Sequence, residues 1–155
     1  MREVNELAFE QPAEARLVDA LRAVARPTVS LVAVDDGRVV GHIFFSPVTI
    51  EGPQGVSTAM GLAPMAVRPG RQNAGIGAAL VREGLAACAT LGERVVVVLG
   101  HPHYYPRFGF VPAATQGLSC EYPVPDEVFM VTELAPGALR GRAGLVKYHP
   151  EFARV

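Results

Sequence analysis

The chain has 155 residues, half of them apolar and 19% charged, a composition typical of a folded domain with a buried core. Its 14 basic and 15 acidic residues give a net charge of −1, which argues against a broad nucleic-acid-binding surface. No apolar run approaches the ~20 residues of a membrane span, the N-terminus lacks the apolar core of a signal peptide, and the two cysteines form no CxxC pair. We therefore expect one domain, residues 1–155, in the cytoplasm.

The first predicted element is a helix over residues 12–25, because four apolar side chains recur there at helical spacing: Leu17, Val18, Leu21 and Val24. Two β-rich runs follow, at 29–34 and 38–49. They flank Asp36-Gly37, which is a strong signal for a hairpin turn.

The sequence "EGPQG" at 51–55 predicts a second turn, followed by a third strand over 56–67. Pro64 lies inside that strand, where it removes a donor from the hydrogen-bond ladder. It indicates an edge, a bulge or a place where the strand leaves its neighbour. A helix is predicted from about Gly75 to Leu91, with Gly92 placed to end it.

The second half of the chain is richer in strands. "ERVVVVLG" at 93–100 is a continuous apolar run, which is typical of a strand buried on both faces. An aromatic loop or short helix at 101–110 follows, then a strand at 127–134 and a last extended piece at 143–152. The order of elements predicts an α/β fold with a mixed sheet covered by helices.

A glycine-rich turn between strand and helix, "AVRPGRQNAGIG", raises the question of why Gly75 and Gly77 stand where a helix begins. Such a turn presents unpaired N–H groups and the positive end of the helix dipole, so it can hold an anion. Arg68 and Arg71 could add attraction. On glycines alone, a tight turn with no ligand explains the pattern equally well.

The sequence does not match either of two common nucleotide-binding motifs, because residues that each motif requires are missing. A dinucleotide fingerprint needs a third glycine where this chain has Leu80, and a carboxylate after the next strand, which instead ends "VVVVLGH". A phosphate-binding Walker loop needs a lysine and a Ser or Thr after its glycines, and these are absent.

The pattern V-x-P-x-x-Q-x-x-G-x-G, from Val67 to Gly77, resembles the acyl-CoA-binding motif of the GNAT superfamily of N-acetyltransferases. "YYPRFGF" is similar to the family's Y-x-x-x-G-F segment, with Tyr105, Gly109 and Phe110 in the matching positions. The match is best with the small bacterial YhbS-type branch, and the resemblance covers nearly the whole chain.

The resemblance implies a GNAT-like acyl-CoA N-acyltransferase fold, in which a mostly antiparallel sheet with a splayed edge is flanked by helices. It implies a transferase that uses acetyl-CoA as donor and needs no metal. Two features depart from the family: its first β-strand is apparently absent here, and the strand before the glycine turn lacks the glutamate that many relatives carry.

By resemblance, the pyrophosphate of acetyl-CoA rests on backbone amides from Gln72 to Ala78, and the pantetheine arm pairs with the strand near Ala63 and Val67. The backbone of Met65 or Ala66 is expected to donate to the thioester oxygen. The implied cofactor-binding positions are Ala63, Met65, Ala66, Val67, Gln72, Asn73, Ala74, Gly75, Ile76, Gly77 and Ala78.

Acetyl transfer also needs a proton for the departing thiolate. Tyr105 is the expected general acid, with Tyr104 as the alternative, because a phenol can donate a proton and the spacing matches the family. Aromatic core packing is the competing interpretation of both. The base stays open among water and four titratable side chains: Glu10, His42, His101 and His103.

Other chemistries have weaker signals. The two histidines of "HPH" are poor evidence for a metal site, Cys88 lies on an apolar helical stripe, and Cys120 has no evident catalytic partner. The loop 111–127 is expected to border the pocket of an unidentified amine acceptor. An acyl-CoA-binding module without catalysis is the alternative function. A homodimer is possible, and no nucleic acid or membrane partner is expected.

Overall fold

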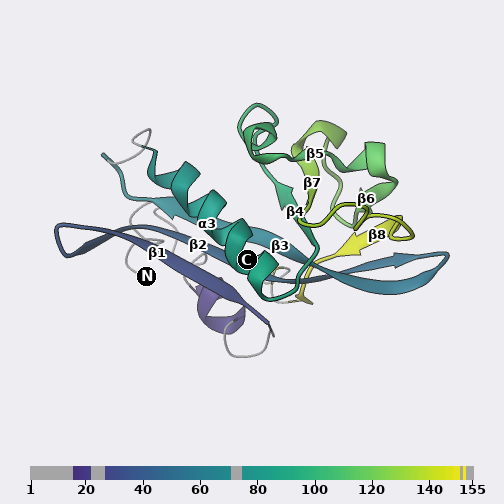
Figure 1. Ribbon diagram of the computed structural model, residues 1–155, viewed down its shortest axis with the longest axis horizontal. Helices are drawn as coiled ribbons and strands as arrows, with labels where there is room; N and C mark the ends of the chain where they lie inside the picture. The colour runs from purple at the N-terminus through teal and green to yellow at the C-terminus, as the bar shows by residue number, and fades with distance from the viewer. Residues whose placement is uncertain (1–15, 22–26, 71–74, 151, 153–155) are drawn as a thin grey trace. The chain divides into compact units, whose positions relative to one another are not determined.

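The computed structural model describes residues 16–21, 27–70, 75–150 and 152, which form a mixed sheet and α3, the longest helix among them (Figure 1). The elements are β1 (Val29–Asp35), β2 (Arg38–Gly52), β3 (Gly55–Val67), α3 (Ile76–Thr90), β4 (Val95–Leu99), η1 (Tyr105–Phe108), β5 (Val111–Pro112), η2 (Ala113–Gln116), β6 (Leu118–Cys120), η3 (Asp126–Val128), β7 (Phe129–Glu133) and β8 (Gly144–Lys147). None of the described helices is long and apolar enough to cross a membrane.

Hydrogen bonds join seven strands in the order β5-β7-β4-β3-β2-β8-β6, and β1 pairs with β2. The pairs β3–β4 and β6–β8 are parallel, whereas β1–β2, β2–β8, β4–β7 and β5–β7 are antiparallel. The expected mixed, mostly antiparallel sheet is therefore confirmed. Whether the family's first strand is missing concerns residues 1–15, which lie outside the described residues.

The chain divides into two compact units. The first consists of residues 1–46, 63–87 and 149–155, and the second of residues 47–62 and 88–148. β2 and β3 each contribute residues to both units, because each strand is longer than the part that either unit contains.

In the first unit, the predicted hairpin is confirmed. Asp36 and Gly37 both have positive φ, 51° and 74°, as a two-residue turn of type I′ requires. The described part of the first helix, residues 16–21, buries three apolar side chains against Phe44: Leu17, Val18 and Leu21. The remainder of the predicted helix, including Val24, lies outside the described residues.

Helix α3 belongs mainly to the first unit, and it ends as the sequence predicts. The N–H of Gly92 donates to Ala89 O (3.0 Å) and that of Glu93 to Cys88 O (3.0 Å), while Gly92 has φ +86°. This pair of bonds is a Schellman cap, which satisfies carbonyls that the helix end leaves open.

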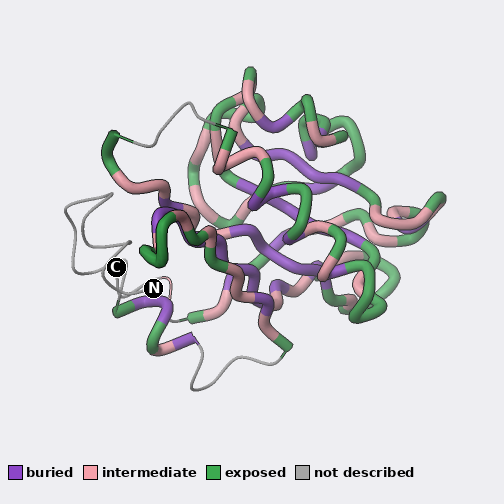
Figure 2. Tube along the Cα trace, turned by 60° about the vertical axis from the view of Figure 1, so that its left-hand side comes forward, coloured by how far each residue is buried: buried purple, intermediate pink, exposed green. Residues whose placement is uncertain are grey.

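In the second unit, the valine run forms β4, and Val95–Val98 are all buried. A strand between β3 and β7 has side chains packed on both faces, which explains why its sequence shows no apolar–polar alternation. Figure 2 shows such buried stretches along the trace in purple.

Candidate functional site

The edge of β3 is the first part of the candidate site. β4 pairs in register with β3 only over Met60–Leu62, yet β3 continues to Val67. β4 ends at Leu99, so from Ala63 onward β3 has no register partner in β4 among the described residues. The Ala63–Pro64 peptide bond is cis.

Side chains along this part of β3 alternate in exposure. Ala63, Met65 and Val67 are half-buried, whereas Pro64 and Ala66 are buried. Because a strand presents alternate residues to opposite faces, the first three share one face and are partly accessible. This arrangement fits an extended ligand that lies along the strand, as expected for the pantetheine arm.

The glycine turn is the second part. Gly75 has φ +80°, a conformation that favours glycine, and no described atom would lie within 4 Å of a Cβ added there. Its carbonyl accepts from Ala79 N (3.0 Å), so Gly75 caps the first turn of α3. The glycine is thus needed for its dihedral angle rather than for close packing against any described residue.

Other predicted residues of the turn have different outcomes. Ile76, Gly77 and Ala78 form the half-buried start of α3. Gln72, Asn73 and Ala74 were predicted to line the anion site, and they lie outside the described residues, as does Arg71. Arg68 at the end of β3 is held by its N–H, which donates to Val40 O (2.7 Å).

Tyr105 lies in the second unit, at the start of η1. It is 7% exposed and packs edge-on against three other aromatic rings: Tyr104, Phe108 and Phe110. A side chain at Gly100 would overlap the Tyr105 ring, so the glycine after β4 lets the ring approach the backbone. The Tyr105 ring is therefore part of an aromatic cluster, and the acid role expected for its phenol would be carried by a side chain that this packing holds in place.

Burial, with a smaller contribution from the adjacent Tyr104, raises the pKa of the Tyr105 phenol from 10.0 to about 12. The phenol therefore carries its proton at every physiological pH, as a general acid must before it donates. Tyr104, the alternative, is only half-buried. Its ring lies 4.8 Å from the guanidinium carbon of Arg107, whose Nε donates to Tyr104 O (3.1 Å).

The four candidate bases are in unlike environments. His42 is fully buried on β2, with Nε2 at 3.2 Å from Ser30 Oγ. His101 and His103 are exposed in the loop before η1, and Glu10 lies outside the described residues. Burial removes His42 from contact with solvent, whereas the two loop histidines are accessible.

Both cysteines are free. Cys88 is buried, and burial raises the pKa of its thiol to about 12, which makes it inert as a nucleophile. The described residues contain no group of three or more histidine, cysteine or acidic side chains arranged to hold a metal ion.

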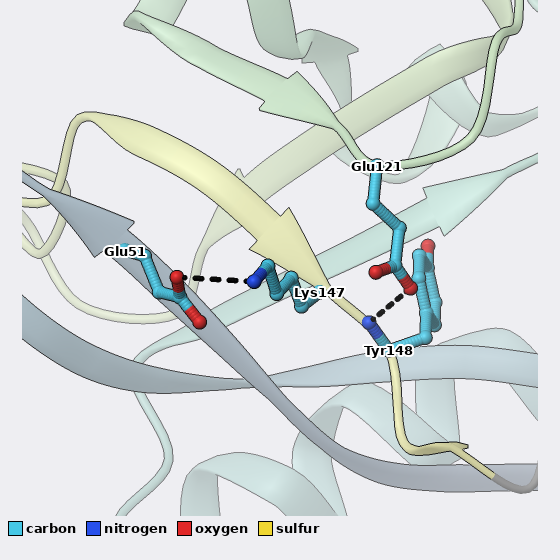
Figure 3. Close-up of polar contacts among 4 residues, drawn as sticks. All are labelled: Glu51, Glu121, Lys147 and Tyr148. Atoms are coloured by element: carbon cyan, nitrogen blue, oxygen red, sulfur yellow. Dashed lines mark hydrogen bonds and ion pairs between the residues drawn. The ribbon is translucent and has the colours of Figure 1, made fainter.

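One cluster was not predicted as a unit. Glu121, after β6, accepts a hydrogen bond from Tyr148 N through Oε1 (3.1 Å), as Figure 3 shows. The Tyr148 ring also stacks on Tyr122, with ring centroids 5.7 Å apart. From the sequence, Glu121 was only part of the loop 111–127, and Tyr148 only part of the last extended piece at 143–152. Nothing in one sequence indicates that residues 27 apart meet across β6 and β8.

Comparison with known proteins gives concordant results. Residues 1–113 match the acetyltransferase (GNAT) domain family. The chain is 43% identical over 148 residues to the uncharacterized N-acetyltransferase YhbS of Escherichia coli K12, covering 95% of this chain and 87% of that protein.

Two solved structures are similar over most of the fold. The Escherichia coli YhbS structure in complex with CoA is 40% identical, with a TM-score of 0.89, over 99% of this chain and 84% of that one. A GNAT family acetyltransferase from Brucella melitensis in complex with acetyl-CoA is also 40% identical, with a TM-score of 0.78, over 97% and 88%. The chain belongs to the GNAT family of acetyltransferases.

Proposed function

We propose that the protein is an N-acetyltransferase that transfers an acetyl group from acetyl-CoA to a primary amine in a ternary complex. The observation that carries this proposal is the edge of β3, which continues from Ala63 to Val67 after its pairing with β4 has ended. Family membership and the CoA-bound relatives support the identity of the donor.

The chain's own residues fit the donor in two places. The backbone of β3 beyond Leu62 offers hydrogen-bonding groups to the pantetheine arm, and Gly75 with the first residues of α3 offers backbone N–H groups to the pyrophosphate. In the proposed site, residues 72–78 bind the pyrophosphate and the backbone of Met65 or Ala66 donates to the thioester oxygen.

The transfer needs no covalent enzyme intermediate. The neutral amine attacks the thioester carbonyl carbon, the C–N bond forms and the C–S bond breaks. The thiolate takes a proton from the Tyr105 phenol, and the amine nitrogen loses one proton to water or to a base. The products are the acetylated amine and the CoA thiol. Tyr105 is left as a phenolate, and it is ready for another turnover once the proton released by the amine reaches it.

We extend the proposal to the whole chain. Residues 1–155 act as one catalytic domain, since β2 and β3 each contribute residues to both compact units. The location proposed for this domain is the cytoplasm. A homodimer through an exposed strand edge is also proposed, because β1 pairs only with β2 among the described strands and carries exposed Val32 and Val34.

Calorimetric titration with acetyl-CoA, CoA and NAD tests donor binding. We expect micromolar binding of both CoA compounds and none of NAD, because the glycine turn lacks the features of a dinucleotide site. Folded protein that binds neither CoA compound would refute the proposal.

A turnover assay distinguishes the enzyme from the alternative, an acyl-CoA-binding module without catalysis. Release of CoA thiol from acetyl-CoA in the presence of a panel of primary amines shows an enzyme. CoA binding without amine-dependent release, across amines of different charge and size, would favour the binding module.

A further inference from the structure

We propose that Glu121, with the rings of Tyr122 and Tyr148, binds the ammonium form of the acceptor, which loses one proton to water before its nitrogen attacks, so that the substrates are aliphatic amines that are protonated at neutral pH. This inference rests on the proposed N-acetyltransferase function and names its acceptor class. Three features of the cluster carry it: a fixed carboxylate, the lack of an ion-paired cation beside it among the described residues, and stacked aromatic rings.

The carboxylate of Glu121 is fixed at both ends of the residue. Its Oε1 accepts from Tyr148 N (3.1 Å; Figure 3), and its backbone N–H donates to Val146 O (3.1 Å), so side chain and backbone both bind the β8 segment. The residue is nevertheless exposed. A carboxylate that is held in place but open to solvent can bind a ligand with little loss of side-chain entropy.

No cationic side chain of the described residues pairs with this carboxylate, although the Tyr122 side chain hydrogen-bonds to it. The neighbouring cation, Lys147, lies beside Glu51 with Nζ to Oε1 at 3.3 Å, directed away from Glu121 (Figure 3). Side chains alternate along a strand, which is why Lys147 and Tyr148 point to different sides of β8. The negative charge of Glu121 is therefore available to a cationic ligand.

The two tyrosines add apolar and aromatic surface next to the charge. The rings are stacked with an interplanar angle of 28°. Tyr148 is 8% exposed and approaches Gly61 so closely that a Cβ there would lie 3.1 Å from its Cε1, whereas Tyr122 is half-buried. A carboxylate beside a partly accessible aromatic face is suited to an alkylammonium group.

The other acids of the loop lack these features. Asp126 and Glu127 are exposed in the first turn of η3, a three-residue element, and no ring or backbone donor among the described residues holds their carboxylates. Gly61, in contrast, lies two residues before Ala63 on β3 and shares a face with it. The cluster thus borders the same strand whose later residues are proposed to hold the donor.

The experiment uses the full-length protein loaded with CoA and two probes of similar shape, benzylamine and benzyl alcohol. Binding is followed by NMR of the tyrosine rings, which are only four in number. We expect benzylamine, which is a cation at neutral pH, to shift the Tyr122 and Tyr148 resonances and to bind about tenfold more tightly than the neutral alcohol.

Glu121→Gln separates charge from structure, because a glutamine oxygen still accepts the Tyr148 N–H. The variant should weaken benzylamine binding about tenfold, leave benzyl alcohol unchanged and bind CoA as the wild type does. Glu127→Gln removes the same charge from the same loop and should change none of these values.

Equal binding of the two probes, or equal loss in both glutamine variants, would overturn the proposal. A purely structural Glu121 would leave benzylamine affinity unchanged in Glu121→Gln, since the backbone hydrogen bond is kept. Unchanged CoA binding in every variant keeps these outcomes distinct from a failure of the proposed enzyme at the donor site.

Discussion

Tyr105 shows how a single side chain serves packing and chemistry together. Its ring is held by three aromatic neighbours, and the same burial that stabilises the ring keeps the phenol protonated, with its pKa raised to about 12. A surface tyrosine would lose its proton nearer its ordinary pKa of ~10. Burial therefore extends the pH range over which Tyr105 can act as an acid.

Tyr105→Phe tests that role, because the substitution removes only the phenolic hydroxyl group. The ring and its packing remain, so acetyl-CoA affinity and stability should be nearly unchanged, while kcat for amine acetylation falls by about 10²-fold or more. Steady-state kinetics and CoA titration on the same preparation measure both. The wild-type rate should show no alkaline loss from this phenol near pH 10, since its pKa lies near 12.

Tyr104→Phe is the matched control, because it removes the neighbouring phenol from the same segment. Its ring stays beneath Arg107, and its kcat should stay close to the wild-type value. A large loss in Tyr104→Phe with normal activity in Tyr105→Phe would exchange the two roles.

At the scale of the element, α3 shows how a glycine can stabilise a helix that it ought to weaken. Gly84 lies in the middle of α3, where glycine usually costs about 1 kcal/mol relative to alanine. A Cβ at Gly84 would overlap the ring of Phe45 on β2. The missing side chain lets the helix pack close to that ring, which is fully buried.

Gly84→Ala should therefore destabilise the protein by about 1–3 kcal/mol, despite the better helix propensity of alanine, because the added methyl group forces the helix and Phe45 apart. Urea unfolding measures the change. Ala86→Gly, at an exposed position of the same helix, should cost about 1 kcal/mol, the usual difference in helix propensity between alanine and glycine. Greater stability in Gly84→Ala would contradict the close packing.

Elements with strong local signals could be predicted from the sequence. The hairpin at Asp36-Gly37, α3 with its cap at Gly92 and the buried run of β4 each carry their cause in a few consecutive residues. β5 and β6 have two and three residues, and pairing with β7 and β8 defines them. Their partners are distant in sequence, so no local pattern reveals them.

The candidate site divides in the same way. Gly75 and Tyr105 belong to local motifs and could be named in advance, whereas the cluster of Glu121 and Tyr148 depends on the parallel pairing of β6 with β8. A parallel pair needs a crossover connection and leaves no short signature in the sequence. Such long-range pairing is also where the acceptor specificity is proposed to reside.

At the scale of the whole molecule, buried weak acids in different elements make stability depend on alkaline pH. Burial raises the pKa of Cys88 in α3 from 9.0 to about 12 and that of Tyr105 from 10.0 to about 12. It also raises the pKa of Tyr148 well above its usual range. In the unfolded chain, all three groups ionise at their ordinary values.

The unfolded state therefore loses these protons before the folded state does, and the free energy of unfolding falls as pH rises. The loss should begin near pH 9, where an unfolded Cys88 ionises, and steepen above pH 10 as the tyrosines join. Each group contributes about 1.4 kcal/mol per pH unit until its folded pKa is reached. Below pH 9 these three groups leave stability unchanged.

Urea unfolding from pH 8 to 11 measures this slope, and Cys88→Ala isolates the thiol. The variant loses some packing at every pH, but its decline should start about one pH unit later than that of the wild type, since only tyrosines remain to ionise in the unfolded chain. Parallel curves for the two proteins between pH 9 and 10 would mean that Cys88 ionises as readily in the folded state as in the unfolded one. The thiol would then be accessible to water, and α3 would open locally without unfolding of the whole molecule.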